Sequence, residues 1–527
     1  MKKCISALAA LCFPIWGMAQ GYISGDLMMN VNFFQRDTNI KAAGNPLYDN
    51  FLSGGEGWLG LRYNGNGFNA VVRFDGFNHS NLQQPNTALT AAGIGMFSLS
   101  KEVKDLTITA GHVYDQIGSG ILFRAYEDRG LLIDNALFGL HLKYKFSNRF
   151  MMKGFTGQSK NLFERYKPII KGINAEGDFD LGKTVHCTPG IGIVNRTMDQ
   201  GSMDKVVGTI NSLPLPDRFI PVYNSYAATV YNTLNAGDIT WYVEGAVKSR
   251  EAVATLDGLK NVWGNVIYST LGYARGKFGV NASAKRTENF MMRTSPNESL
   301  IRGLYNWQPI IAQIRPQRLI ARYTPPSQDL SEIAYTLNGF FTPNDEYTFN
   351  LNYTHINSLQ KDTLYRELFA EAEIRSVKNI IFHVGAQYLV YNQALYQQKV
   401  KEDYPIVHAL TPFAEIIYKI DNKRSARTEW QYMRTKQDFG SWVFALFEFN
   451  IASRWSFAVS DMYNIAPNYK HVNKAHHYPN FFVARTYGPH RLTLQYVKQV
   501  EGINCTGGVC RYEPAFSGVK MSVISTF

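Results

Sequence analysis

Ionisable side chains crowd one stretch of the sequence, Gly111 to Asn135, which reads GHVYDQIGSGILFRAYEDRGLLIDN. They are Asp115, Arg124, Glu127, Asp128, Arg129 and Asp134. Carboxylates and guanidinium groups at this density pair with each other where water is excluded, because a buried ion is tolerated only when it is paired. Gly118-Ser119-Gly120 allows a sharp bend between them. Two interpretations stay open: a loop folded inward and fixed by arginine–carboxylate bonds, or a loop that constricts a passage or binds a ligand.

A second set of ionisable side chains recurs at alternate positions of the C-terminal half. Its members are Glu367, Glu371, Glu373, Glu415, Arg427, Glu429 and Glu448, with Gln431 beside them. Paired carboxylates are able to do acid–base work. No pair here has another feature of a catalytic site, so we expect a polar wall in which Arg and Lys balance the acids.

Other motifs of reactive residues are weak. His471, His476 and His477 are close enough in sequence for a surface metal site, but ordinary loop histidines are the favoured interpretation. Gly93-Ile94-Gly95 lacks the third glycine and the helix of a nucleotide-binding turn. No serine and histidine form the arrangement of a hydrolase. The sequence therefore indicates no enzyme, cofactor or metal site.

In the segments that position these residues, apolar and polar side chains alternate with a period of two residues. From Tyr347 to Thr354, aromatic and aliphatic residues alternate with Thr and Asn, and Ile23–Phe33 and Arg491–Gln499 show the same pattern. This alternation is typical of antiparallel strands with one apolar and one polar face. It fits a soluble sheet as well as a membrane barrel, whose apolar face meets lipid while the polar face lines the interior.

Short turns that alternate with long connections favour the barrel. The turns are Asn64–Gly67, Ser147–Arg149, Arg275–Lys277, Pro343–Asp345, Asp421–Lys423 and Gly488–His490. The long connections are Arg36–Ser53, Gln116–Asn135, Asp199–Val222, Asn289–Leu330 and Asn464–Tyr478. We expect an all-β fold: a large antiparallel transmembrane barrel of about 24 strands, within a range of roughly 18 to 26, with short periplasmic turns, long extracellular loops and both mature termini periplasmic.

Residues 1–19 have the features of a secretory signal peptide. Lys2 and Lys3 precede the apolar stretch Ile5–Trp16, and small residues follow, so cleavage before Gln20 is expected. The expected barrel spans residues 20–527, and no plug domain is expected ahead of its first strand. Of 54 Lys and Arg two are lost with the signal, so the mature charge is 52 − 42 = +10. For an exported chain, this charge favours anionic lipid headgroups, lipopolysaccharide or anionic solutes as partners, and not nucleic acid.

Three cysteines remain after cleavage. Cys505 and Cys510 flank a turn-like Thr-Gly-Gly-Val stretch, and we predict a disulfide between them at a loop tip, because export makes disulfides possible. Cys187 is then left as a small buried side chain. The terminal residue, Phe527, ends a strand with period-two alternation, and it resembles the insertion signal that barrel-assembly machinery reads.

Three groups of residues carry a family resemblance. The C-terminal group is His477-Tyr478-Pro479, Arg491-Leu492, Tyr496, Lys498-Gln499, Gly502-Ile503, Cys505, Gly507-Gly508-Val509-Cys510-Arg511, Pro514-Ala515 and Gly518. The others are Tyr114–Gly120 with Arg124, Tyr126–Arg129 and Ile133–Asn135, and Lys436-Gln437-Asp438 with Tyr463-Asn464. Together they resemble a Bacteroidota family of outer-membrane barrels of unknown function. Ile117 departs from that family, where an aromatic is frequent. The resemblance implies an outer-membrane barrel and no settled activity.

Two functions remain open from the sequence. The polar inner face and the folded-in loop favour a porin-like channel for polar or anionic solutes. The long, aromatic-rich loops favour a non-conducting subunit of a larger outer-membrane assembly for secretion or surface-polymer export, with other outer-membrane proteins as partners.

Overall fold

The computed structural model describes residues 21–83, 87–255, 258–298, 302–326, 330–472, 474–506 and 509–527, without the side chains of 503–511. The expected signal peptide at 1–19 lies outside these residues, as does the part of the chain ahead of the first strand on which the absence of a plug domain was predicted.

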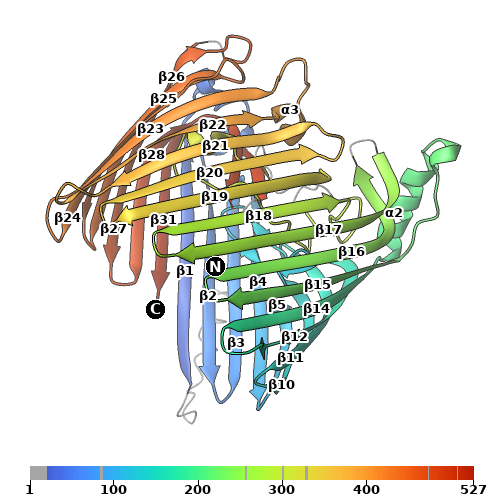
Figure 1. Ribbon diagram of the computed structural model, residues 1–527. Coiled ribbons are helices and arrows are strands. Elements are labelled where there is room, and N and C mark those ends of the chain that lie inside the picture. Colours follow the sequence, from blue (N-terminus) through green and yellow to red (C-terminus); the bar gives the residue numbers. More distant parts are fainter. Residues whose placement is uncertain are drawn as a thin grey trace.

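Twenty-four long strands form one antiparallel sheet (Figure 1). They are β1 (Tyr22–Phe34), β2 (Ser53–Gly65), β3 (Phe68–Ser80), β4 (Leu89–Val103), β5 (Leu106–Val113), β10 (Leu137–Ser147), β11 (Phe150–Asn161), β12 (Glu164–Gly177), β14 (Val185–Thr197), β15 (Asn224–Ala236), β16 (Ile239–Thr255), β17 (Gly258–Arg275), β18 (Phe278–Glu288), β19 (Glu332–Asn344), β20 (Tyr347–Ser358), β21 (Thr363–Ile374), β22 (Ile380–Tyr391), β23 (Val407–Lys419), β24 (Arg424–Met433), β25 (Gly440–Ile451), β26 (Trp455–Pro467), β27 (His477–Tyr487), β28 (His490–Gln499) and β31 (Phe516–Thr526). A two-residue strand, β13 (Phe179–Asp180), adds to the same sheet. The predicted strand number is confirmed.

The sheet closes on itself. Each long strand pairs with its neighbours along the chain, and β31 pairs with β1 from Asp26↔Thr526 to Phe34↔Gly518. The main chain of Phe527 exchanges two hydrogen bonds with Gly25, at 2.7 and 2.9 Å. Closure leaves no open edge, which is what a sheet in lipid requires, since no water is there to satisfy an unpaired strand.

The two ends of the barrel differ. Tight connections lie at one end, the turn end, and all six predicted short turns are among them. The opposite end, the loop end, carries the long connections. The predicted connection Asn464–Tyr478 is shorter than expected, because β26 continues to Pro467 and β27 already begins at His477. The connection between β22 and β23 was not predicted, and it holds the short helix α3 (Gln393–Gln397).

The outer face of the barrel is apolar. Ile94, Ile267 and Leu351 point outward and are 54%, 59% and 56% exposed. Exposed aromatic residues form two girdles that bound this apolar band. The loop-end girdle includes Tyr226, Trp263, Tyr335, Tyr388, Trp430 and Tyr432, and the turn-end girdle includes Phe68, Tyr144, Phe146, Phe150, Tyr273, Phe278, Tyr418, Phe447 and Tyr487.

The spacing of the girdles matches a bilayer. Trp263 and Tyr273 stand ten residues apart on β17, which is about 33 Å along a strand. A strand tilt of about 40° reduces this to about 25 Å, the height of the apolar band of transmembrane barrels. No helix of the described part of the chain is long and apolar enough to cross a membrane.

The lumen contains segments of the chain's own loops. Residues 114–136 fold inward with β6 (Asp115–Ile117), β7 (Phe123–Ala125), β8 (Glu127–Asp128) and β9 (Ile133–Asp134). The long connection between β18 and β19 also turns inward, with the helical turn η4 (Ile320–Tyr323). We call its residues 311–323 the strap.

Other loop segments pack at the loop end or project from it. They include η1 (Thr38–Ile40), η2 (Leu47–Phe51) and the hairpin of β29 (Gly502–Thr506) and β30 (Val509–Glu513). Helix α2 (Gln200–Asn211) and the turn η3 (Leu215–Asp217) extend away from the barrel wall, at the right of Figure 1.

Candidate functional site

The inward segment 114–136 owes its shape to a tight glycine turn and an apolar face. Gly118 and Gly120 have φ of +54° and +96°, which strongly favour glycine. They reverse the chain between β6 and β7, so that Ile117 pairs with Phe123. The side chains around this turn are almost completely buried against an apolar patch of the inner wall. They are Ile117, Ile121, Leu122 and Phe123, and the patch includes Phe155, Ile170, Val194 and Val266.

Glu244 on β16 holds the tip of this turn. It accepts hydrogen bonds from the Ser119 amide at 3.0 Å and from the Ser119 hydroxyl. Tyr242 and Thr229 donate to the same carboxylate at 2.7 and 2.9 Å. A fully buried carboxylate with this many donors is a fixed anchor, so the turn cannot slide along the wall.

Arg73 on β3 organises the ionic half of the segment. Its guanidinium contacts Asp75 at 2.6 Å, Glu127 at 2.5 Å and Asp134 at 2.7 Å. Lys160 on β11 forms a further ion pair with Asp134, and Tyr114 donates to the same carboxyl group at 2.9 Å. Burial opposes the ionisation of Asp134, but Lys160 and Arg73 outweigh it and hold the pKa of this carboxyl group below its ordinary value.

The other acids that the sequence singled out here are also fixed. Asp115 contacts Lys153 at 2.8 Å and His141 at 3.1 Å. Burial opposes its ionisation, but these partners lower the pKa of Asp115 overall. Asp128 accepts from the Leu131 amide at 3.1 Å. Arg129 lies 2.9 Å from Glu127 and 3.4 Å from Asp26.

Arg124 departs from the expected arginine–carboxylate pairing. Its guanidinium lies between the rings of Tyr126 and Trp307, 4.6 and 4.7 Å from their centroids. Among the residues that the structure describes, no carboxylate contacts it. Stacking of this kind leaves the N–H edge of the guanidinium available to an anion.

The predicted wall acids form a separate cluster on β21 to β25. Arg427 contacts Glu415, Glu429 and Glu448, at 2.5, 2.5 and 3.4 Å. Within the described ranges no ion pair joins this cluster to the inward segment.

The remaining wall acids contact a histidine or an arginine. His383 lies 3.5 Å from Glu371. Glu373 contacts Arg375, and the fully buried Glu367 accepts from Arg315 of the strap at 3.3 Å. Six acids of the wall thus meet three arginines and one histidine, so the wall carries more acids than cations.

The strap is pinned to the wall on both sides of Arg318. Ahead of it, Arg315 stacks on Phe369 at 3.4 Å. After it, the Leu319 amide donates to Gln431 at 2.7 Å, and Arg322 and Tyr323 both contact Asp438.

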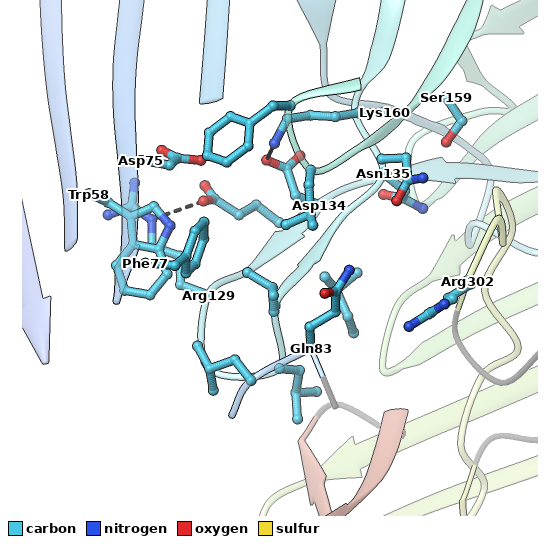
Figure 2. A pocket seen from close by; sticks show the side chains of 18 of the residues that line it. Trp58, Asp75, Phe77, Gln83, Arg129, Asp134, Asn135, Ser159, Lys160 and Arg302 are labelled. Carbon is cyan, nitrogen blue, oxygen red and sulfur yellow. Dashed lines mark hydrogen bonds and ion pairs between the residues drawn. The ribbon is translucent and has the colours of Figure 1, made fainter. Parts of the chain in front are cut away.

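A cavity of about 110 Å³ borders the ionic half of the inward segment (Figure 2). Figure 2 shows Lys160 directed at Asp134, and Arg302 reaching toward the cavity from the side opposite Trp58. A second cavity of about 250 Å³ shares Leu82 and Arg129 with it. Its lining includes polar, uncharged residues of β1, β28 and β31 such as Asn30, Asn32, Thr493, Gln495 and Ser522.

The three histidines of the β26–β27 region do not converge. His471 stacks on Tyr404, whereas His477 contacts Asp461 at 2.5 Å. His476 packs edge-on against Tyr478. Over the part of the chain that the structure describes, no group of three His, Cys, Asp or Glu residues is placed to hold a metal ion.

Two sequence predictions concern cysteines. The backbone register places Cys505 directly opposite Cys510 across the β29–β30 hairpin, but their side chains lie outside the described residues, so the disulfide stays a prediction. Cys187 is a free thiol on β14, half-buried rather than buried as expected.

Sequence reasoning missed the wall partners of the inward segment. Arg73, Lys153, Lys160 and Glu244 were not singled out, and neither was Arg302. The available signal was the alternation of polar and apolar residues along β3. Arg73 and Asp75 alternate with Val72 and Phe74, which marks them as inward residues of a strand. Which loop they would meet depends on the closure of the barrel.

Comparisons with known proteins show which family the chain belongs to. No curated protein matches the chain in sequence. Among solved structures, the P pilus usher PapC translocation pore has a TM-score of 0.45 at 11% identity, covering 96% of this chain and 99% of that one. The siderophore receptor PirA from Pseudomonas aeruginosa has a TM-score of 0.43 at 7% identity, covering 96% and 80%. A family model matches residues 1–527, and the chain therefore belongs to the family of unknown function DUF6029.

Proposed function

We propose that this protein is an outer-membrane channel that passes polar or anionic solutes through a loop-lined lumen. The closed barrel, its apolar outer band and its two aromatic girdles support the membrane location. The polar inner face and the two adjoining cavities support a path for polar solutes.

One observation favours anions: three arginines on the inward segments have no carboxylate partner among the described residues. They are Arg124, Arg302 and Arg318, and they lie apart from the acids of the wall that cluster around Arg427. Burial lowers the pKa of Arg318, and so does the neighbouring Arg322, while Glu513 opposes them. An arginine stays charged despite such shifts, so these three side chains place positive charge on the inward loops.

Ion selectivity in planar bilayers tests this proposal. The purified barrel is compared with a triple variant, Arg124→Gln, Arg302→Gln and Arg318→Gln, under a salt gradient. The wild type is expected to prefer chloride over potassium, and the variant to lose most of that preference. A control variant with the same change in net charge, Lys205→Gln, Arg250→Gln and Lys378→Gln, alters only exposed residues and should retain it. A silent wild type, or a preference that survives the triple substitution, would contradict the proposal.

A second candidate, a subunit of a larger surface assembly, is favoured by the projection around helix α2. Met203, Val206 and Ile210 pack one face of the helix against the barrel, but Leu215 and Ile220 beyond it are 77% and 88% exposed. Val207, Val222 and Tyr223 of the same segment are exposed as well, and a group of exposed apolar residues suits protein contact. Gentle extraction and pull-down should then recover a stoichiometric partner that Leu215→Ser with Ile220→Ser releases. Repeated recovery of the barrel alone would exclude this role.

A further inference from the structure

The cavity of about 250 Å³ lies on the lumenal side of the seam that closes the barrel. Its wall belongs to β28, β31, β1 and β2, which are neighbours in the sheet although they come from opposite ends of the sequence. Leu82 lines the cavity as well, and so do Arg129 and Gly130 of the inward segment. The cavity is therefore a cleft between the closing seam and the inward segment.

Strand register sets the polar side chains of this wall side by side. One row of directly opposite residues, taken across the four strands, is Thr493, Ser522, Asn30 and Glu56. The next row is Gln495, Lys520 and Asn32. All seven residues line the cavity. Directly opposite residues of an antiparallel pair have Cβ atoms about 4.5–5.5 Å apart, so neighbours in a row are able to bind the same small molecule.

Four of these side chains have unused hydrogen-bonding groups. Within the described residues, the side chains of Asn30, Asn32, Thr493 and Ser522 form no hydrogen bond to another part of the chain. Each of the four is partly exposed. An amide and a hydroxyl group each both donate and accept. The cavity wall thus presents two amides and two hydroxyl groups, with donors and acceptors close together.

The charged groups of the lining are balanced in number and have partners in the chain. They are two cations, Arg129 and Lys520, and two acids, Glu56 and Glu513. Arg129 contacts Glu127 at 2.9 Å, and Lys520 lies over the ring of Phe516, 4.3 Å from its centroid. The acids accept hydrogen bonds from Ser80 and Gln499. The described lining therefore lacks the excess of one sign that would select an ionised solute.

The wall and the size of the cavity define the chemistry of its ligand. A sugar is neutral and carries neighbouring hydroxyl groups, each of which donates and accepts, and this matches alternating amides and hydroxyls. The cavity volume of about 250 Å³ is far above the roughly 10–15 Å³ that one water molecule needs. It is slightly below the roughly 300–1,000 Å³ of pockets for drug-sized ligands. One or two sugar rings have this size.

We propose that this cavity binds a neutral sugar, which is hydrogen-bonded by Asn30, Asn32, Thr493 and Ser522. The site gives the polar solute of the proposed channel a chemical class, and it rests on that function for the solute's route. Binding at the site is an equilibrium property, so it is testable without any measurement of conduction.

Saturation-transfer difference NMR of the full-length barrel, in a detergent without a sugar headgroup, tests the site. Glucose, galactose, maltose and lactose are titrated separately, and at least one of them is expected to bind saturably. Asn30→Ala with Asn32→Ala should weaken this binding about tenfold or more, and Thr493→Val by about two- to tenfold, because each substitution removes hydrogen bonds to the ligand. Glucuronate and glucosamine, which are charged, should bind no more tightly than the best neutral sugar.

Asn281→Ala with Asn338→Ala is the matched control. These two asparagines lie directly opposite each other on β18 and β19, away from the lining of the cavity, so their loss should leave the affinity unchanged. Heat-dependent gel mobility shows that each variant is folded.

Three results would overturn the site: no saturable binding of any of the four sugars, tighter binding of a charged sugar, or wild-type affinity after loss of both Asn30 and Asn32. The site and the channel fail in different ways. Conductance without sugar binding would leave the channel and remove the site, whereas sugar binding to a silent barrel would do the reverse.

Discussion

At the scale of single residues, Arg73 is the side chain on which most of the inward segment depends. It is 3% exposed and contacts three carboxylates. Loss of one partner of a buried ionic network leaves uncompensated charges away from water, which costs about 3–5 kcal/mol. An exposed ion pair contributes far less, about 0–1 kcal/mol.

We therefore expect Arg73→Gln to release residues 119–133 from the wall. Limited proteolysis of the folded barrel should show new cleavage within this segment, together with a lower unfolding midpoint in denaturant. Arg149→Gln is the control, since Arg149 and Asp180 form an ion pair whose side chains are 66% and 61% exposed. Equal resistance of Arg73→Gln and wild type to protease would show that the apolar contacts alone hold the segment.

The acids of the segment also give it a defined dependence on pH. The pKa values of Asp115 and Asp134 are lower in the folded protein than in the unfolded chain. Their contribution to stability is therefore complete above about pH 4, the ordinary range of Asp, and is lost as the pH falls through the lowered values. The hydrogen-exchange protection factors of residues 119–133 should stay high from pH 8 to pH 5 and fall only below about pH 4. A fall in protection between pH 8 and pH 6 would point to a histidine instead.

At the scale of elements, the glycine turn of the inward segment tolerates substitution least. A Cβ on Gly118 would lie 2.9 Å from the Glu244 carboxylate, and φ there is positive. Gly118→Ala should therefore cost about 1–3 kcal/mol and loosen the turn in the proteolysis assay. Gly208→Ala in helix α2 meets nothing within 4 Å, and it should stabilise that helix by about 0.5–1 kcal/mol. Equal stability and equal resistance to protease in the two variants would contradict this role of Gly118.

Deletion of the segment tests its effect on the lumen as a whole. A variant without residues 119–133 loses the turn, six buried apolar side chains and the carboxylate Glu127 that contacts Arg73. If the segment narrows a pore, single-channel conductance should rise in the deletion variant while the barrel stays folded. Unchanged conductance would mean that another element, such as the strap, sets the narrowest point.

The elements were predictable from the sequence to the extent that local patterns determine them. Alternation identified the strands, and Asn64–Gly67 and similar stretches identified the turns, because both signals lie within a few residues. The inward segment was recognised as unusual, since glycine and charge coincide there. Its partners were not predictable: Glu244 lies 125 residues from Ser119, and no local pattern reports a contact across the lumen.

At the scale of the whole molecule, the orientation of each face determines which charges are tolerated. Leu351 is on the outer face between the girdles, whereas its neighbour Asn350 is on the inner face, 3.3 Å from Glu371. Leu351→Arg should therefore cost about 2–4 kcal/mol of folding free energy in lipid, and Asn350→Arg should be tolerated because an acid faces it. The folded fraction in lipid vesicles, measured by heat-dependent gel mobility, checks this contrast. Similar folding of both variants would count against a membrane-facing outer wall.

The anchors of the lumenal segments also impose an order in time. The turn at Gly118 is held by Glu244 on β16, and the strap is held by Asn352 on β20 and Gln431 on β24. Each of these anchors follows its segment in the chain, so neither segment finds its final position until strands made later are in place. The last seam joins β31 to β1 and leaves no side opening. A segment that is still outside when this seam forms is left with only the ends of the barrel as a way into the lumen.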